Sequence, residues 1–321
     1  MKKITKQTYL DWYENMYFWR KFEDKLAQVY IKQKVRGFLH LYNGQEAILA
    51  GALHVMDLTK DKMITAYRNH VQPIGMGVDP KRVMAELYGK VTGTSKGMGG
   101  SMHIFSKKHG FYGGHGIVGA QVPIGIGLAF AHNYRKEKKI SRIYLGDGAM
   151  NNGQVFESFN LASLWNLPAL FIIENNHYGM GTATKRSAAG GDLFERAKIF
   201  GIEGEKIDGM NFFTVSEAAI KARDYIIKEN KPYVIEMDTY RFRGHSMSDP
   251  ALYRSKEEVL EKKEIDPVLT MREALIKDYK ITEAEIKDIE TGIKKNIKET
   301  EQFALTSPLP ELKELYTDIY L

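Results

Sequence analysis

Two short polar motifs have the residue types to bind a metal ion and a phosphorylated ligand. The GDG motif places Asp147 directly after the apolar run RIYL, and the NN motif places Asn176 after the apolar run ALFIIE. These two residues are 29 positions apart. A carboxylate and an amide carbonyl are hard oxygen ligands of the kind that Mg²⁺ binds, usually together with phosphate oxygens. Taken singly, each motif is also consistent with an ordinary turn.

A parallel sheet would bring the two motifs together. Four short apolar runs predict strands, with helical stretches between them: residues 63–67, 142–145, 169–174 and 233–237. This alternation is typical of an α/β fold with a mostly parallel sheet and helices on both faces. Ligands collect beyond the carboxyl ends of such strands, so Asp147 and Asn176 are expected to face one crevice. A helix that opens at 151–154 should point free N–H groups there, which predicts a magnesium-bridged diphosphate.

Helices are predicted at both ends of a single α/β domain, 1–321. The N-terminal helical arm, 1–35, has apolar and aromatic residues at three- and four-residue spacing, which suits either a subunit interface or plain core packing. The charged, amphipathic helical tail, 255–321, predicts surface helices. Three residues of the helix between the two motifs are expected to face inward: Phe156, Phe159 and Leu164.

The composition restricts the class of protein. The chain has 321 residues, 43% of them hydrophobic, which is enough for a large buried core. A run of about 18 apolar residues, as a membrane span needs, is absent from the sequence, and acids at Asp11 and Glu14 argue against a signal peptide. Zero cysteines suit a reducing compartment, so a cytoplasmic location is expected. The net charge of +6 comes from dispersed lysines, which does not favour a nucleic-acid partner.

Further motifs occur in the order in which a known family has them, over roughly residues 10–260. They are RGFLHLYNGQEA, ITAYRNH, KGMGGSMHIF, FYGGHGIVGAQVP, GDGAMNNGQVFE, ENNHYGMGT and TYRFRGHSMSDP. With them the chain resembles α subunits of the thiamin diphosphate-dependent decarboxylating component of 2-oxo acid dehydrogenase complexes, and it is most similar to members that act on pyruvate. The resemblance implies the thiamin diphosphate-binding fold, decarboxylation of pyruvate, and acetyl transfer to a lipoyl group on an acetyltransferase component.

The resemblance also implies roles for individual residues. Mg²⁺ would be bound by Asp147, Asn176 and the backbone carbonyl of Tyr178. The other positions that match cofactor contacts are Tyr67, Arg68, Gly116, Val118, Gly148, Ala149 and His245. Among the nine histidines, His40 would lie toward the substrate, and His245 is a candidate for proton transfer to the lipoyl dithiolane. Structural roles are expected for His70, His103, His115 and His177.

The cofactor needs a carboxyl group at its ring nitrogen N1′, and the chain offers no convincing glutamate. Glu46 follows Gly44 and Gln45 at the start of a predicted helix, and Glu157 lies on the helix between the two motifs. In the family this glutamate comes from a separate β subunit. The resemblance therefore implies a heterotetramer of two α and two β subunits, with the cofactor between the chains and an inactive isolated α chain.

Other interpretations stay open. Relatives that act on acetoin or branched-chain 2-oxo acids differ in the patterns here reading GHSMSDP, GDG and YGMGT, but substrate choice also depends on the β subunit. The motif Gly114-x-Gly116-x-x-Gly119 could indicate a nicotinamide-dependent oxidoreductase, although SMHIFSKKHGFY before it is a poor strand. The retained motifs argue against a non-catalytic scaffold. Ser246 matches a position phosphorylated in mammalian members, whereas another such position is Ala183 here.

Overall fold

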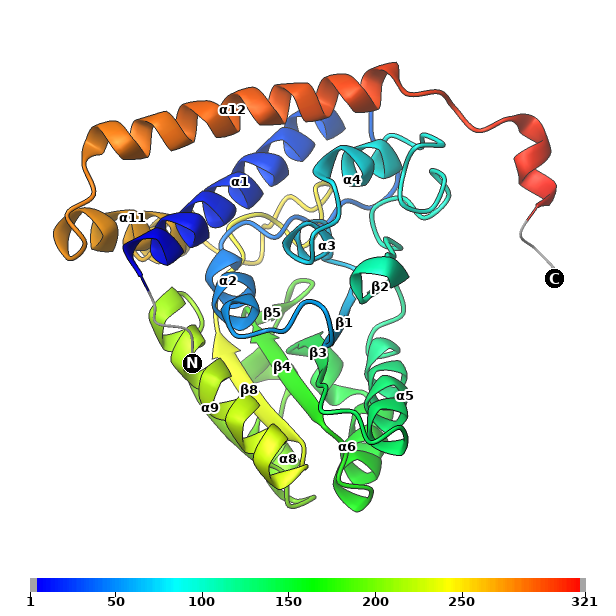
Figure 1. Cartoon of the computed structure of the whole chain (residues 1–321), viewed down its shortest axis with the longest axis vertical. Coiled ribbons are helices and arrows are strands. Elements are labelled where there is room, and N and C mark those ends of the chain that lie inside the picture. The colour runs from blue at the N-terminus through cyan, green and yellow to red at the C-terminus, as the bar shows by residue number, and fades with distance from the viewer. Residues whose placement is uncertain (1–4, 318–321) are drawn as a thin grey trace.

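A six-stranded parallel sheet forms the centre of the computed structural model, which describes residues 5–317 (Figure 1). The order of strands is β2-β1-β3-β4-β8-β7. Their bounds are β1 Lys62–Ala66, β2 Phe111–His115, β3 Ser141–Gly146, β4 Ala169–Asn175, β7 Glu203–Asp208 and β8 Tyr233–Asp238. A separate antiparallel ribbon consists of β5 Tyr178–Gly179 and β6 Thr182–Ala183. The predicted parallel α/β fold is confirmed.

The register between β3 and β4 brings the two motifs to the same edge of the sheet. Ser141 pairs with Ala169 at one end of the ladder, and Gly146 pairs with Glu174 at the other. Asp147 therefore follows β3 at nearly the same depth at which Asn176 follows β4. The central strands consist of apolar runs because a parallel sheet is covered on both faces.

Helices cover both faces of the sheet. One face is covered by α5 Gln121–Tyr134, α6 Gly153–Leu164 and α8 Glu195–Lys198. On the other side lie α1 Lys6–Ile31, α2 Glu46–His54 and α9 Phe212–Glu229, and Figure 1 shows α9 and α5 on opposite sides of the strands. Successive strand residues face alternate layers: Ile143 packs with the α5 layer, and Tyr144 packs with the α1 and α2 layer.

The terminal helices pack onto the body of the chain. Tyr13 and Trp19 on α1 are fully buried, so core packing accounts for the aromatic residues of this helix. Helix α12 lies along α1 and α4 (Figure 1). The C-terminal helices are α10 Lys256–Glu264, α11 Pro267–Lys277 and α12 Glu283–Thr306. The remaining short helices are α3 Val71–Gly75, α4 Pro80–Leu87, α7 Thr184–Ser187, and the 3₁₀ turns η1 Lys107–His109, η2 Gly148–Asn151 and η3 Leu312–Tyr316.

The fold differs from expectation in two details. Leu164 is 66% exposed at the end of α6, whereas Phe159 is fully buried and Phe156 is half-buried. The expectation for Leu164 is wrong because the inward stripe of α6 runs through Val155, Phe159 and Ala162. The second detail is β2: residues 101–110 do not form an extended strand, as expected for SMHIFSKKHGFY, but Phe111–His115 form a strand that runs into the GxGxxG motif.

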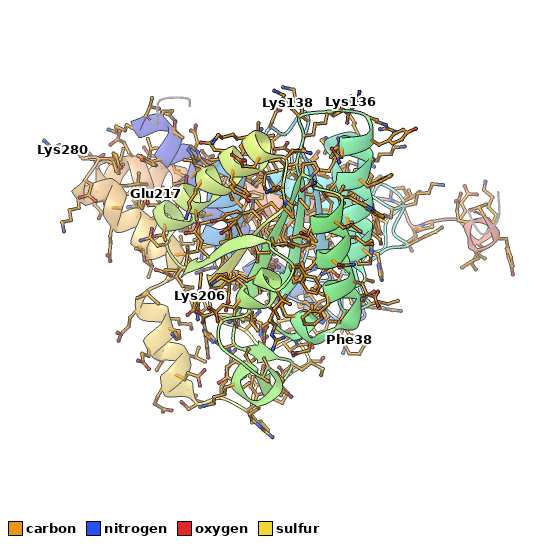
Figure 2. The ribbon with its side chains drawn as sticks, turned by 90° about the horizontal axis from the view of Figure 1, so that it is seen from below. Phe38, Lys136, Lys138, Lys206, Glu217 and Lys280 are labelled. Carbon is orange, nitrogen blue, oxygen red and sulfur yellow. The ribbon has the colours of Figure 1, made fainter. Side chains whose placement is uncertain are left out.

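The lysines labelled in Figure 2 lie on more than one part of the surface. Lys136 and Lys138 lie together near the end of α5, while Lys206 and Lys280 lie elsewhere on the surface (Figure 2). Within residues 5–317, none of the helices is both long and apolar enough to cross a membrane.

Candidate active site

A cavity of about 730 Å³ lies beyond the carboxyl ends of β1, β3 and β4. Every residue that the sequence predicted for metal, cofactor or substrate lines this cavity. These residues are His40, Tyr67, Arg68, Gly116, Val118, Asp147, Gly148, Ala149, Asn176, Tyr178 and His245. They come from loops that are far apart in the sequence, and the parallel sheet gathers those loops at one edge.

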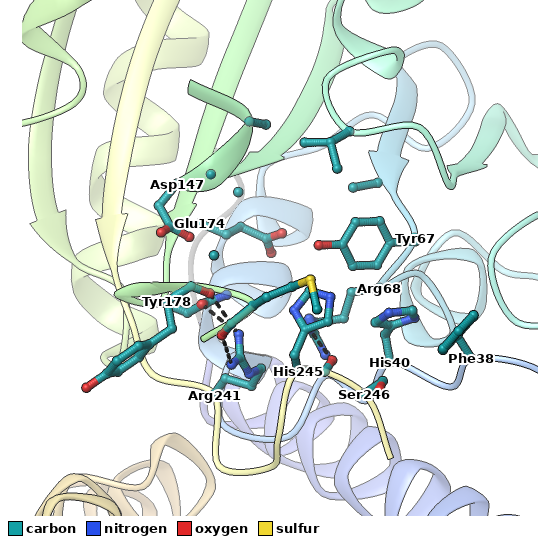
Figure 3. Close-up of a pocket in the computed structure, with 18 of the residues that line it drawn as sticks. Phe38, His40, Tyr67, Arg68, Asp147, Glu174, Tyr178, Arg241, His245 and Ser246 are labelled. Atoms are coloured by element: carbon teal, nitrogen blue, oxygen red, sulfur yellow. Dashed lines mark hydrogen bonds between the residues drawn. The ribbon is translucent and has the colours of Figure 1, made fainter. Parts of the chain in front are cut away.

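Two of the predicted metal ligands share one hydrogen-bond donor. The guanidinium Nη1 of Arg241 donates to Asn176 Oδ1 at 3.2 Å and to the backbone carbonyl of Tyr178 at 3.0 Å. The ring of Tyr178 points away from the cavity, and its hydroxyl donates to Glu258 (Figure 3). An amide oxygen and a carbonyl oxygen therefore converge on one point, which a positive charge occupies.

Asp147 lies on the same side of the cavity as Tyr178 (Figure 3). Its side chain is buried, and Oδ2 accepts a hydrogen bond of 2.7 Å from Thr184 Oγ1. Burial raises the pKa of Asp147, and the hydrogen bond from Thr184 opposes that shift. A buried carboxylate gains stability from a cation at close range, so this environment favours metal binding.

The backbone directly after β3 lies beside that of the β5–β6 ribbon without crowding it. A Cβ added to Gly148 would lie 3.6 Å from the Cα of Gly179, so two glycines face each other here. Residues 146–149 line the cavity, at the start of the turn η2. A helix does begin within 151–154 as expected, because α6 starts at Gly153 with Asn152 as its N-cap. Residues 151–154 do not line the cavity, so the predicted contact of their N–H groups with a ligand gains no support.

Arg68 is a buried cation in the cavity wall. Its Nη1 donates to the carbonyl of Leu41 at 2.6 Å, and its Nη2 donates to the carbonyl of His245 at 3.0 Å. Burial, and then the like charge of Arg241, lower the pKa of Arg68 to about 10, so it stays protonated at neutral pH. The side chain of Arg68 is buried, and the ion pairs found among residues 5–317 do not include it. Two adjacent buried guanidinium groups favour an anionic ligand.

His40, Tyr67 and His245 form a cluster of rings. The ring centroids of His40 and Tyr67 are 4.5 Å apart, and those of His40 and His245 are 5.0 Å apart. Burial and the charge of Arg68 lower the pKa of His40 to about 2 and that of His245 to about 4. Both imidazoles are therefore neutral at pH 7 in the chain without a ligand.

The loop that carries His245 is tied to Arg241. Arg241 Nη2 donates to the hydroxyl of Tyr253 at 2.6 Å, and that hydroxyl donates to Asp249 Oδ2 at 2.8 Å. The same carboxylate oxygen accepts from the backbone N–H of His245 at 2.6 Å. The oxygens that converge on Arg241 are thus linked to His245 by a short hydrogen-bond path.

Several polar residues that were not predicted as site residues also line the cavity, among them Gln45, Glu174 and Arg241. Gln45 Oε1 accepts from Asn176 Nδ2 at 3.0 Å, which leaves the amide oxygen of Asn176 free to face Arg241. Glu174 accepts from the hydroxyl of Tyr42. Burial raises the pKa of Glu174 to about 7, against the opposing effects of Tyr42 and Arg68. The only signal for these three residues in the sequence is that each lies inside one of the motifs quoted above.

Several buried polar atoms of the cavity residues have no hydrogen-bond partner in the described part of the chain. They are His40 Nδ1, Gln45 Nε2, Gln121 Oε1 and His245 Nδ1. Buried donors and acceptors are normally paired, so unpaired ones around a cavity indicate that a polar ligand belongs there.

The residues expected to be structural lie outside the cavity. His70 contacts Glu23 and Ser101, and His177 contacts Asp238. His103 and His115 do not line the cavity either. Glu46 is paired with Arg20 and Glu157 is exposed on α6, so neither presents a carboxyl group to the cavity.

The fold and cavity define an α/β protein with a polar cavity at the carboxyl edge of a parallel sheet, lined by two arginines and by the oxygen groups of Asp147, Asn176 and Tyr178. The family model described as "Dehydrogenase E1 component" matches residues 14–313. The chain belongs to this family.

Similar proteins align over nearly the full length. The protein named pyruvate dehydrogenase E1 component subunit alpha from Rickettsia felis is 49% identical over 318 residues, covering 99% of this chain and 97% of the relative. The protein of the same name from Zymomonas mobilis is 48% identical, covering 97% of this chain and 88% of the relative. A protein named as the mitochondrial form from Dictyostelium discoideum is 45% identical, covering 98% and 83%.

The nicotinamide alternative gains nothing from β2, which itself contains Gly114, the first glycine of the motif. In a dinucleotide-binding unit, the strand before the glycines lies beside the next strand of the chain. Here β2 is the edge strand and β1 lies between it and β3. Gly116 instead lines the same cavity as Asp147 and the other predicted site residues.

Proposed function

We propose that this chain is the α subunit of a pyruvate dehydrogenase E1 component. It acts with thiamin diphosphate to decarboxylate pyruvate, and it passes the acetyl group to a lipoyl group of the acetyltransferase component. The observation that carries the proposal is the single cavity in which every matched residue meets, at the edge of the sheet where β3 and β4 end. The printed names of the relatives support the choice of pyruvate.

The residues of the cavity fit thiamin diphosphate with Mg²⁺. Asp147, Asn176 Oδ1 and the carbonyl of Tyr178 would hold the metal, since all three are oxygen ligands. Arg68 would bind the diphosphate, and the backbone near Gly148 is open enough for its close approach. When bound, the cofactor supplies the nucleophilic carbon and the electron sink for loss of CO₂. A bound cation would take over the two oxygens that Arg241 now contacts.

The ring cluster would bind the substrate and handle protons. His40 lies near the partly exposed Phe38, away from Asp147 (Figure 3), which suits a role toward an entering substrate. The ring of His245 contacts that of His40, and its backbone carbonyl accepts from Arg68. Its Nδ1 has no hydrogen-bond partner among the described residues. An anion beside the two arginines would offset the positive charge that lowers the pKa of His245, and would thereby make proton transfer at neutral pH easier.

Replacing His245 by alanine is expected to lower the rate of lipoyl acetylation by about 10²- to 10⁴-fold, the usual worth of a positioned proton donor. Decarboxylation measured with an artificial electron acceptor should fall much less, because that assay omits the dithiolane. Cofactor occupancy must be equal in both proteins. His177→Ala is the matched control, since His177 contacts Asp238 outside the cavity. Normal lipoyl acetylation by His245→Ala would remove His245 from this step.

The choice of substrate is tested on the chain co-expressed with its β subunit. Steady-state rates with pyruvate, acetoin and branched-chain 2-oxo acids are compared at saturating Mg²⁺ and thiamin diphosphate. We expect kcat/KM to be highest for pyruvate. A higher value for acetoin or for a branched acid would assign the chain to a sibling activity of the same family.

The partners and the location follow from the same proposal. The chain would assemble with a β subunit, in a heterotetramer of two α and two β subunits, and would deliver acetyl groups to a lipoyl-bearing acetyltransferase. We place it in the cytoplasm, because a sequence without cysteine suits a reducing compartment. The Dictyostelium relative is named as mitochondrial, so fractionation of cells is the test.

A further inference from the structure

The glycine-rich loop 93–100 surrounds the carboxylate of Glu86, a residue of this chain. Glycine-rich loops often cradle phosphates with their backbone N–H groups. Here the buried side chain of Glu86, on α4, takes that place. Its Oε2 accepts from the N–H groups of Ser95 at 2.7 Å and Gly97 at 2.9 Å. Its Oε1 accepts from those of Gly99 at 2.7 Å and Gly100 at 3.1 Å.

The loop needs glycine because it closes tightly around this carboxylate. A Cβ at Gly93 would lie 2.3 Å from Glu86 Oε2, and one at Gly99 would lie 2.1 Å from the carbonyl of His103. Gly97 and Gly100 have φ values of 81° and 58°, which L side chains rarely adopt. The shape of the loop therefore depends on an anion at its centre.

Ser101, which follows the loop, contacts the segment after β1, where Tyr67 and Arg68 line the cavity. Ser101 accepts from Asn69 Nδ2 through its carbonyl at 3.1 Å, and its hydroxyl contacts His70 Nε2 at 2.7 Å. Asn69 and His70 come directly after Tyr67 and Arg68, which line the cavity. The loop thus supports the chain at the end of β1.

Residues 102–104 contact another part of the cavity wall, the segment around Gly116 at the end of β2. Met102 lines the cavity. A Cβ at Gly116 would lie 3.4 Å from the ring of His103, and the N–H of Gly114 donates to the carbonyl of Ile104 at 3.2 Å. Residues 101–105 are therefore packed between the end of β1 and the end of β2, and Glu86 fixes the loop that leads into them.

We propose that Glu86, which does not itself line the cavity, is a positioning residue for the cofactor pocket. Its carboxylate organises loop 93–100, and through residues 101–105 it sets the wall formed by the segments at Tyr67 and Gly116. The inference rests on the proposed function for the identity of the ligand. Glutamine at this position would turn an amide N–H₂ toward two backbone N–H donors, so the loop would lose its shape while the volume of the side chain is kept.

The test uses the complex of this chain with its β subunit and three variants: Glu86→Gln, Glu86→Asp and the control Glu205→Gln. Glu205 is a hydrogen-bonded carboxylate on β7, at the other edge of the sheet. We expect Glu86→Gln to speed hydrogen exchange in the peptide 93–103 by about tenfold or more. It should weaken thiamin diphosphate binding by about tenfold, with kcat at saturating cofactor within about twofold of wild type. Glu86→Asp should show smaller changes in the same directions, and Glu205→Gln should match wild type.

Unchanged exchange in Glu86→Gln would overturn the inference, and so would faster exchange with unchanged affinity for thiamin diphosphate. If Glu86→Gln does not assemble, Glu86→Asp decides by the same two measurements. A wild-type complex that fails to bind thiamin diphosphate would overturn the proposed function. Equal binding by wild type and Glu86→Gln would overturn only the role of Glu86.

Discussion

Asp147→Asn is expected to abolish Mg²⁺-dependent binding of thiamin diphosphate, and catalysis with it. Asparagine has the same size and can still accept the hydrogen bond from Thr184, so the fold should be kept. It lacks the negative charge that a divalent cation requires. A metal contact worth several kcal/mol corresponds to a loss of roughly 10³-fold or more in rate. Steady-state decarboxylation by the complex at rising Mg²⁺ and cofactor measures this, with circular dichroism as the check on folding.

Asp238→Asn is the matched control for this substitution. Asp238 ends β8, the strand beside β4, but it contacts His177 and does not line the cavity. It should keep activity close to wild type. An Asp147→Asn complex with normal rates and a normal requirement for Mg²⁺ would contradict the assignment of Asp147 as a metal ligand.

The chain without a β subunit is expected to show no measurable decarboxylation of pyruvate, and addition of the β subunit should restore it. Glu46 and Glu157, the glutamates considered from sequence, do not reach the cavity. Glu174 does line it, but it sits two positions before Asn176 and accepts from Tyr42. That places it at the metal end of the proposed site. We therefore expect the carboxyl group for the cofactor ring to come from another chain. Release of CO₂ from labelled pyruvate, with and without the partner, is the measurement.

Activity in the isolated chain would show that the carboxyl group needed by the cofactor ring belongs to this chain. Glu174 would then be the first residue to test, because burial raises its pKa to about 7 and it can hold a proton near neutral pH. Glu174→Gln in the isolated chain would abolish such activity if Glu174 were that acid. The same substitution would leave an activity with another origin largely unchanged.

The buried central strands could be predicted because their sequences are apolar. β2 and β7 were missed because their sequences lack such a pattern. β3 and β4 are covered on both faces and consist of continuous apolar runs. β2 has the sequence FYGGH, in which two glycines remove the pattern. β7 is an edge strand in which four of the six residues, EGEKID, are charged, so it has no hydrophobic pattern. The helix end at Leu164 was assigned the wrong face because a period of 3.6 leaves the last turn ambiguous.

The site was predictable where function depends on a strand end. Asp147 and Asn176 follow predicted strands, and topology alone brings them together. Arg241 and Gln45 could not be placed in this way. Arg241 contacts Asn176 across 65 positions of sequence, and Gln45 contacts it across 131. Those contacts depend on the packing of loops and of α2, which no local pattern specifies.

The most direct test of the account is a crystal structure of the complex with Mn²⁺ in place of Mg²⁺ and with thiamin diphosphate, in which anomalous scattering locates the metal. We expect one ion at roughly 2.0–2.2 Å from a carboxylate oxygen of Asp147, from Asn176 Oδ1 and from the carbonyl of Tyr178, with diphosphate oxygens among its other ligands. An ion bound elsewhere, or a diphosphate bound without contact to these three oxygens, would contradict the proposed site.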